Sequence, residues 1–313
     1  MTAGAIAGGN GPGAGPSGSI YDLGYQSYTG PRLGRRHAIR ALFRHTLRVC
    51  YGIGRGGRAK IAPFVLGAFA IIPAVVGVGV LALARQMGAP GSVLEEASPI
   101  QHHTYYQLMA TLLMLFCAAQ VPEILGRDQR HSLLSLYFSR ALRRDDYALS
   151  RLAGIVAGIL VFLLLPQAII VLGLVLSSPD VSAELGRELA FVPPILAQGL
   201  LMSLLLGSVT AAIASFTPRR LYATTAIIVV LAVIPVIANV LVELGTEDIA
   251  RFVVLVSPMD IVDATNAILF GRGQPSEIVQ AANLPDVAWF AAVGVLVVLS
   301  VTVLLRRFRS IAA

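Results

Sequence analysis

Six long apolar runs limit what this chain can fold into. A helix needs about 20 apolar residues to cross the roughly 30 Å hydrocarbon core of a bilayer. The runs of that length are Ile61–Ala84, Tyr105–Leu125, Leu152–Leu176, Leu189–Phe216, Leu221–Val242 and Val287–Leu305. Only Glu123, at the end of the second run, interrupts the apolar pattern. Strands of a membrane barrel are shorter and alternate in polarity, so the runs predict an all-α integral membrane protein with six transmembrane helices.

The composition excludes the common soluble classes. Hydrophobic residues make up 56% of the 313 positions and charged residues 13%, whereas a soluble domain has about 25% charged residues. So few polar groups would leave a soluble surface uncovered. Cys50 and Cys117 fall in different predicted elements and form no disulfide framework. An ordinary soluble enzyme, a disordered protein and a disulfide-stapled secreted domain are therefore excluded.

The basic residues between the runs predict how the helices are oriented. Of the 24 Lys and Arg residues, 20 lie before the first run, after the sixth, or in the links between runs two and three and between runs four and five. Twelve of the 17 acidic residues lie on the opposite side. Positively charged links stay in the cytoplasm, so both termini are expected there. The same asymmetry indicates that the excess of basic residues reflects membrane topology and contact with anionic lipids. We therefore expect no nucleic-acid partner.

Two segments precede the first run. Residues 1–34 begin with a stretch rich in Gly, Ala, Ser and Pro, which predicts a disordered cytoplasmic tail. Residues 35–58 predict an amphipathic helix, because Arg36, Arg40, Arg44 and Arg48 share one arc and apolar residues such as Phe43 fill the opposite arc. Such a helix should lie in the cytoplasmic membrane interface. Residues 59–309 hold the six spans.

Two of the links between the apolar runs are longer than a simple turn requires. The cytoplasmic segment 126–150 predicts a short surface helix flanked by mixed charge, with candidate residues Arg127, Asp128, Arg130, Leu133, Leu134, Tyr137, Phe138 and Arg144. The extracellular segment 244–286 predicts two short helices joined at Ser257-Pro258 over the outer end of the bundle. Its candidate residues are Phe252, Pro258, Ile261 and Phe270. The two apolar stretches of this segment, Phe252–Val256 and Ile261–Phe270, are too short to cross a bilayer.

The common catalytic, nucleotide-binding and metal-binding motifs do not occur in the sequence. Lys60 is the single lysine and follows Ala59, so a phosphate-binding Gly-Lys-Ser/Thr loop cannot form. Neither a His-Glu-x-x-His motif nor a Cys/His cluster occurs, and the vicinal pair His102-His103 points two ways on a helix. We therefore expect no catalytic residue, cofactor or metal in this chain, and a partner that supplies the energy.

These elements, in this order, resemble the membrane subunit of a type-2 ABC exporter. Many such permeases carry an acid, then Asp-Arg-x-x-Gly-Thr-Leu, Leu-Ser-Arg-Pro and Arg-x-x-Tyr in the link before span three. The second link is similar to permeases of the antibiotic-, sodium- and multicopper-enzyme-maturation exporter groups. The residues in comparable places are Glu123, Asp128, Arg130, Leu133, Ser139, Arg140, Arg144 and Tyr147.

The resemblance implies a permease subunit, not itself an enzyme, in the inner membrane of a bacterium. A second copy or a paralogous permease would complete the pathway, and two cytoplasmic ATPase subunits, holding ATP and Mg, would drive it. It implies that segment 126–150 receives the force as a coupling helix, that segment 35–58 is an elbow helix bracing the first span, and that segment 244–286 gates the outer end.

Two other classes stay open. A secondary carrier or channel would need an ionisable pair at mid-membrane or an internal repeat, and neither is evident. A membrane enzyme or a non-transporting scaffold is the third reading. An ATPase subunit recovered with the chain would separate the first class from the other two.

Overall fold

The computed structural model describes residues 30, 33–88, 101–139, 142–243, 250–271 and 275–310. The chain divides into two units, Met1–Leu33 and Gly34–Ala313, and the helices below all belong to the second. The tail expected for residues 1–34 lies almost wholly outside the described residues. Within the described residues every regular element is a helix, which confirms the all-α fold class.

Six long helical stretches correspond to the six apolar runs. They are α2 (Arg58–Gln86), α4 (His102–Arg130), α6 (Arg144–Leu176), α7 (Val181–Ser215), the continuous α8 (Arg220–Ile228), η1 (Val229–Val233) and α9 (Ile234–Glu243), and α13 (Asp286–Ser310). Each is long and apolar enough to cross a bilayer. The chain is therefore a multi-span helical membrane protein, as the apolar runs predicted.

The long helices extend beyond their apolar runs. The α7 helix begins at Val181 instead of Leu189, and α4 continues to Arg130. A hydropathy count stops at the first charged side chains, whereas helical hydrogen bonding continues while those side chains find partners. The Asp180 carboxylate caps α7 by accepting from the Ser182 and Ala183 amides at 3.1 and 3.0 Å, and these bonds lower its pKa. Residues 126–130 and 144–150 of segment 126–150 likewise belong to the ends of α4 and α6.

Shorter helices complete the fold. They are α1 (Gly34–Cys50), α5 (Leu134–Phe138), α10 (Ala250–Val253), η2 (Val254–Val256), α11 (Pro258–Phe270) and α12 (Glu277–Ala282). Ser257 caps α11 by accepting from the Asp260 amide at 3.4 Å, and Pro258 occupies the first turn. The joint expected at Ser257-Pro258 is therefore present, while α12 was not predicted.

The two ends of the helical bundle differ in charge. Charged side chains connect the end of α4 to the beginning of α6, and the end of α13 to the beginning of α6 and the end of α7. We call this the basic end of the bundle, since the arginine-rich links meet there. The other end, where α7 begins and α6 ends, is called the acidic end.

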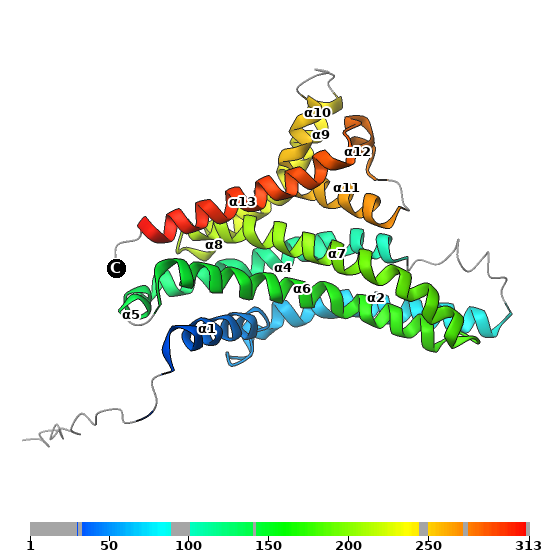
Figure 1. The fold of residues 1–313 in the computed structure, drawn as a ribbon, viewed down its shortest axis with the longest axis horizontal. Coiled ribbons are helices and arrows are strands. Elements are labelled where there is room, and N and C mark those ends of the chain that lie inside the picture. The colour runs from blue at the N-terminus through cyan, green and yellow to red at the C-terminus, as the bar shows by residue number, and fades with distance from the viewer. Residues whose placement is uncertain are drawn as a thin grey trace, which may run out of the picture. The chain divides into compact units, whose positions relative to one another are not determined.

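Glycines on α6 let its neighbours approach closely. In Figure 1, α6 runs between α1 and α2 on one side and α7 on the other, and it packs against all three. A Cβ at Gly154 would lie 2.5 Å from the Thr46 Cβ of α1, and one at Gly158 would lie 2.8 Å from the Cys50 Sγ. The Tyr51 hydroxyl donates to the Gly158 carbonyl at 2.7 Å. Small residues spaced by four are a usual contact between membrane helices, so α1 is packed onto α6.

We expect Gly154→Ala to weaken this contact. Its Cβ would overlap Thr46, and overpacking of this kind costs about 1–3 kcal/mol. The thermal unfolding midpoint of the full chain in detergent should fall. Maleimide labelling of Cys50 should rise, because this thiol is buried in the native chain and its burial raises its pKa to about 12.

Gly294→Ala is the matched control. Gly294 is a helical glycine of α13 with no atom within 4 Å of an added Cβ, and alanine favours a helix over glycine by about 1 kcal/mol. Its midpoint should be unchanged or higher. Equal behaviour of the two variants would show that Gly154 is not a close contact.

Candidate functional site

A buried ion pair at the basic end joins α4 to α6. Asp128, in the last turn of α4, contacts the Arg151 guanidinium, near the start of α6, through one carboxylate oxygen. The Tyr147 hydroxyl donates to the same oxygen, with 2.6 Å between the two oxygens. Asp128 is 5% exposed and Arg151 is 1% exposed. Because removing either partner would leave a buried charge unpaired, a pair of this kind is costly to break.

Arg151 also reaches α1. Its Nη1 donates to the Thr46 Oγ1 at 3.0 Å, and the Thr46 hydroxyl donates to the Leu42 carbonyl at 2.8 Å. The guanidinium carbon lies 5.4 Å from the centre of the Tyr147 ring, within cation–π range. Among the residues that the structure describes, its buried Nε has no hydrogen-bond partner. One guanidinium therefore holds α1, α4 and α6 together.

Tyr147 is also the centre of an aromatic cluster. Its ring centre lies 5.4 Å from that of Tyr137, 5.9 Å from that of Phe138 and 5.2 Å from that of Phe308. Tyr137 and Phe138 belong to α5, and Phe308 belongs to α13. Edge-on and tilted aromatic pairs at these distances are favourable. The short helix α5 is thus packed on the same side chain that binds Asp128.

Exposed ion pairs surround this buried group. Arg35 forms two bonds to the Asp146 carboxylate at 2.7 and 2.6 Å, and Asp146 raises the Arg35 pKa. Arg309 forms two bonds to Asp145 at 2.7 and 2.8 Å. The Arg144 guanidinium donates to the Arg309 carbonyl at 2.6 Å. Exposed pairs contribute about 0–1 kcal/mol, so they align α1, α6 and α13 without dominating stability.

The Glu123 carboxylate lies close to arginines from three parts of the chain. Its carboxylate lies 3.0 Å from Arg55, 3.2 Å from Arg130 and 3.9 Å from Arg220. Partial burial is the main influence on Arg55 and lowers its pKa, although Glu123 acts in the opposite direction. The one charged residue within the apolar runs is therefore paired, which explains how α4 accommodates it.

The residues proposed for ATPase coupling divide into a buried and an exposed group. Leu134 is buried and packs in the core, and Tyr137 and Phe138 are half-buried against Tyr147. Leu133, in the link between α4 and α5, is also half-buried. Arg144 is half-buried beside α13. The exposed residues are Arg127, Arg130 and Leu136, and Leu136 is 61% exposed; we call these three the α4–α5 edge. Asp128 does not belong to this edge, because its carboxylate is satisfied inside the chain.

The residues proposed for the elbow helix lie on α1. Arg36, Arg40, Arg44 and Arg48 are exposed and Phe43 is half-buried. The buried face, which includes Leu42, packs against α6. The amphipathic pattern therefore separates a helix-packing face from a charged face.

The residues proposed for the outer gate surround the start and end of α11. Pro258, Ile261 and Phe270 are buried, and Phe252 is about half exposed. The Phe270 ring centre lies 5.9 Å from that of Tyr106. The α11 helix packs against α4, α7 and α13. It carries a buried acid, Asp260, whose pKa is raised mainly by burial.

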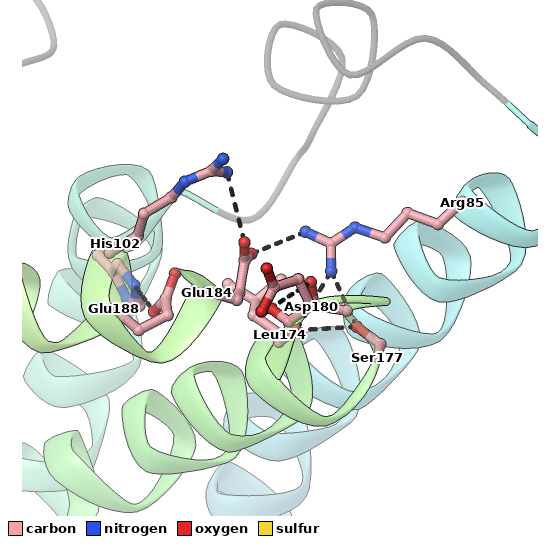
Figure 2. A network of polar contacts seen from close by, with 9 residues as sticks. Arg85, His102, Leu174, Ser177, Asp180, Glu184 and Glu188 are labelled. Atoms are coloured by element: carbon pink, nitrogen blue, oxygen red, sulfur yellow. Dashed lines mark hydrogen bonds and ion pairs between the residues drawn. The ribbon is translucent and has the colours of Figure 1, made fainter. Parts of the chain in front are cut away.

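A second polar network lies at the acidic end and was not predicted. Figure 2 shows Arg85 of α2 reaching Glu184 of α7, at 2.8 Å. His102 of α4 contacts Glu188 of α7, with 3.0 Å between Nε2 and Oε2. His102 Nδ1 lies 2.7 Å from the Gln167 Oε1 of α6. The His102 and Glu188 side chains are only 6% and 7% exposed.

The sequence signal for this network was present but weak. Glu184 and Glu188 are four residues apart and so share one helix face, but the apolar run of the fourth span begins only at Leu189. The acids therefore seemed to belong to a link. The helix start at Val181 brings both of them against neighbouring helices.

The described residues offer no site for a metal or a redox pair. No group of three or more His, Cys, Asp or Glu side chains among them could hold a metal ion. Cys50 and Cys117 are both buried free cysteines. The candidate sites are thus the two charged networks and the exposed α4–α5 edge.

Neither a family of known proteins nor a curated protein sequence matches this chain. The roles of these residues therefore have to be argued from their geometry.

We expect Asp128→Asn to destabilise the chain by about 3–5 kcal/mol, because it leaves the Arg151 charge buried without a carboxylate. Unfolding of the full chain in detergent would measure the loss. Asp145→Asn makes the same chemical change in an exposed pair with Arg309, and its expected cost is below about 1 kcal/mol. Similar losses in the two variants would contradict a special role for the buried pair.

Proposed function

We propose that this chain is the transmembrane permease subunit of an ATP-driven ABC exporter. It would form a translocation pathway as a dimer, with a second copy or a paralogous permease. Separate ATPase subunits would drive it through segment 126–150. The proposal unites the resemblance of the links with the way α5 is attached to the bundle.

The attachment of α5 is the observation that carries the proposal. Tyr137 and Phe138 pack on Tyr147, and Tyr147 is bonded to Asp128. Displacement of α5 would therefore be passed to α4, α6 and α13 together, and through Arg151 to α1. A loop that served only to connect two spans would not need to pack aromatic side chains on Tyr147, which also binds Asp128 and contacts Phe308.

The α4–α5 edge is the surface that a driving subunit would contact. Arg127 and Arg130 offer positive charge and Leu136 offers an exposed apolar side chain. An apolar centre with a charged rim is a common composition of a protein interface. The charges would guide the partner and the leucine would anchor it.

The basic end would face the cytoplasm of a bacterial cell, in accord with the distribution of arginines. As a permease subunit the chain would not hydrolyse ATP through a phosphate-binding loop, because its single lysine, Lys60, is not placed in one. ATP and Mg would bind to the partner ATPase subunits.

One observation favours a secondary, proton-coupled carrier instead. His102 and Glu188 form a buried ionisable pair, and such pairs inside membrane proteins often mark ion pathways. The pair lies near the ends of α4 and α7, however, and not at their middles. A partner-driven permease therefore accounts for more of the structure.

Purification of the full chain from its host in mild detergent tests the proposal. We expect an ABC-type ATPase subunit, identified by mass spectrometry, to accompany the chain. Leu136→Asp should reduce its recovery by about tenfold or more, the loss expected on removal of an interface anchor. No folding defect should accompany it, because Leu136 is exposed.

Val287→Asp is the matched control, since Val287 is an apolar residue at the acidic end that is even more exposed than Leu136. It should leave recovery of the ATPase unchanged. Absence of any ABC-type ATPase beside the native chain, or full recovery with Leu136→Asp, would reject the proposal.

A further inference from the structure

His102 lies between two side chains from two other helices. Its Nδ1 is 2.7 Å from the Oε1 of Gln167 on α6, and its Nε2 is 3.0 Å from the Oε2 of Glu188 on α7. Its ring also lies 5.3 Å, centre to centre, from that of Phe191. Figure 2 shows His102 and Glu188 facing one another beside the Arg85–Glu184 pair. The contact joins α4, α6 and α7 at the acidic end.

The orientation of Gln167 determines which ring nitrogen carries hydrogen. The Gln167 Nε2 donates to the His102 backbone carbonyl at 3.2 Å. A carbonyl oxygen only accepts, so the amide nitrogen has to occupy that position and the amide oxygen has to face the ring. The amide oxygen also only accepts. His102 Nδ1 therefore carries a hydrogen and donates it to Gln167.

With Nδ1 protonated, the contact to Glu188 requires one more proton. A neutral imidazole that carries its hydrogen on Nδ1 presents a lone pair at Nε2. Opposite an ionised Glu188, that lone pair would face a carboxylate oxygen at 3.0 Å, and the two would repel. A hydrogen bond forms only if the proton sits on Nε2, giving an imidazolium and a carboxylate, or on Glu188, giving an imidazole and a carboxylic acid. Both states bind the same single proton.

We propose that His102 and Glu188 form a proton-binding site that latches α4 to α7 at the acidic end. Loss of the proton leaves two acceptors opposed in a buried place, so the latch opens as the pH rises. Because both hydrogen-bonded states hold one proton between the two side chains, the contact is present at low pH and is lost as the pH rises. This inference does not depend on the proposed transport function.

The neighbouring acid on α7 is already paired with arginines. Glu184, one turn before Glu188 on α7, is neutralised by Arg85 of α2 at 2.8 Å and lies 3.4 Å from Arg187. These guanidiniums keep their charge at any ordinary pH. The α6 helix contributes the uncharged Gln167.

Another neighbour is α11, which packs against both α4 and α7. Its Asp263 accepts from the Gln107 amide at 3.1 Å, and its Asn266 donates to the His103 carbonyl at 2.9 Å. Its buried Asp260 follows Ser257, whose hydroxyl accepts from the Asp260 amide. These bonds of Asp263, Asn266 and Asp260 go to Gln107, the His103 carbonyl and Ser257, and not to the His102 ring.

Hydrogen exchange of the full chain in lipid nanodiscs, corrected for the intrinsic effect of pH, tests the latch. In the native chain the first turns of α4 and α7 should exchange about tenfold faster at about pH 8 than at about pH 5, the range in which imidazole changes charge. Glu188→Gln should abolish this difference, because its amide donates to the neutral Nε2 and needs no added proton. His102→Gln should abolish it as well, since it removes the imidazole.

Glu184→Gln is the matched control. It makes the same change one turn away, on the partner of Arg85, and should retain the pH difference. The proposal is overturned if the native chain shows no pH difference, or if Glu188→Gln and His102→Gln keep the native difference.

Discussion

The arrangement of this protein depends on the ion pair between Asp128 and Arg151, which is buried where α4 and α6 meet. Two charges removed from water are tolerated only when each finds its partners. Here the partners come from separate helices: Tyr147 of α6 on the carboxylate, and Thr46 of α1 on the guanidinium. The contact with α1 requires a close approach, which the glycines of α6 permit. Packing and electrostatics therefore select the same arrangement at the basic end.

The two ends of the bundle are held by different chemistry. At the basic end the cations are guanidiniums, which stay charged at any ordinary pH. At the acidic end His102 meets Glu188, and imidazole changes charge near neutral pH. The basic end is thus suited to transmitting force through a fixed connection. The acidic end has a guanidinium pair as well, Arg85 with Glu184, and beside it the His102–Glu188 contact that we propose to open as the pH rises.

The fold could be predicted from the sequence because a helix that crosses the bilayer needs a long apolar run, which hydropathy detects. All six spans were found, as was the joint at Ser257-Pro258, where a capping serine precedes a proline. Charged residues near helix ends were less predictable. Asp128 was a candidate residue of the coupling segment, and the sequence did not indicate its burial against Arg151, because residues 23 apart on two helices become neighbours only through the helix packing. Glu188 was assigned to a link because a hydropathy count ends at charged residues. It does not reveal that the helix includes this charged turn and that its acids are paired with neighbouring helices.

In the function that we propose, α5 is the point where a separate ATP-hydrolysing subunit acts on this chain. A photo-reactive amino acid at position 136, on the exposed surface of α5, tests it most directly, with the equally exposed position 298 of α13 as the reference. The account predicts that light joins position 136 to an ABC-type ATPase subunit and position 298 to lipid or another membrane helix. Attachment of position 136 to lipid alone would contradict it.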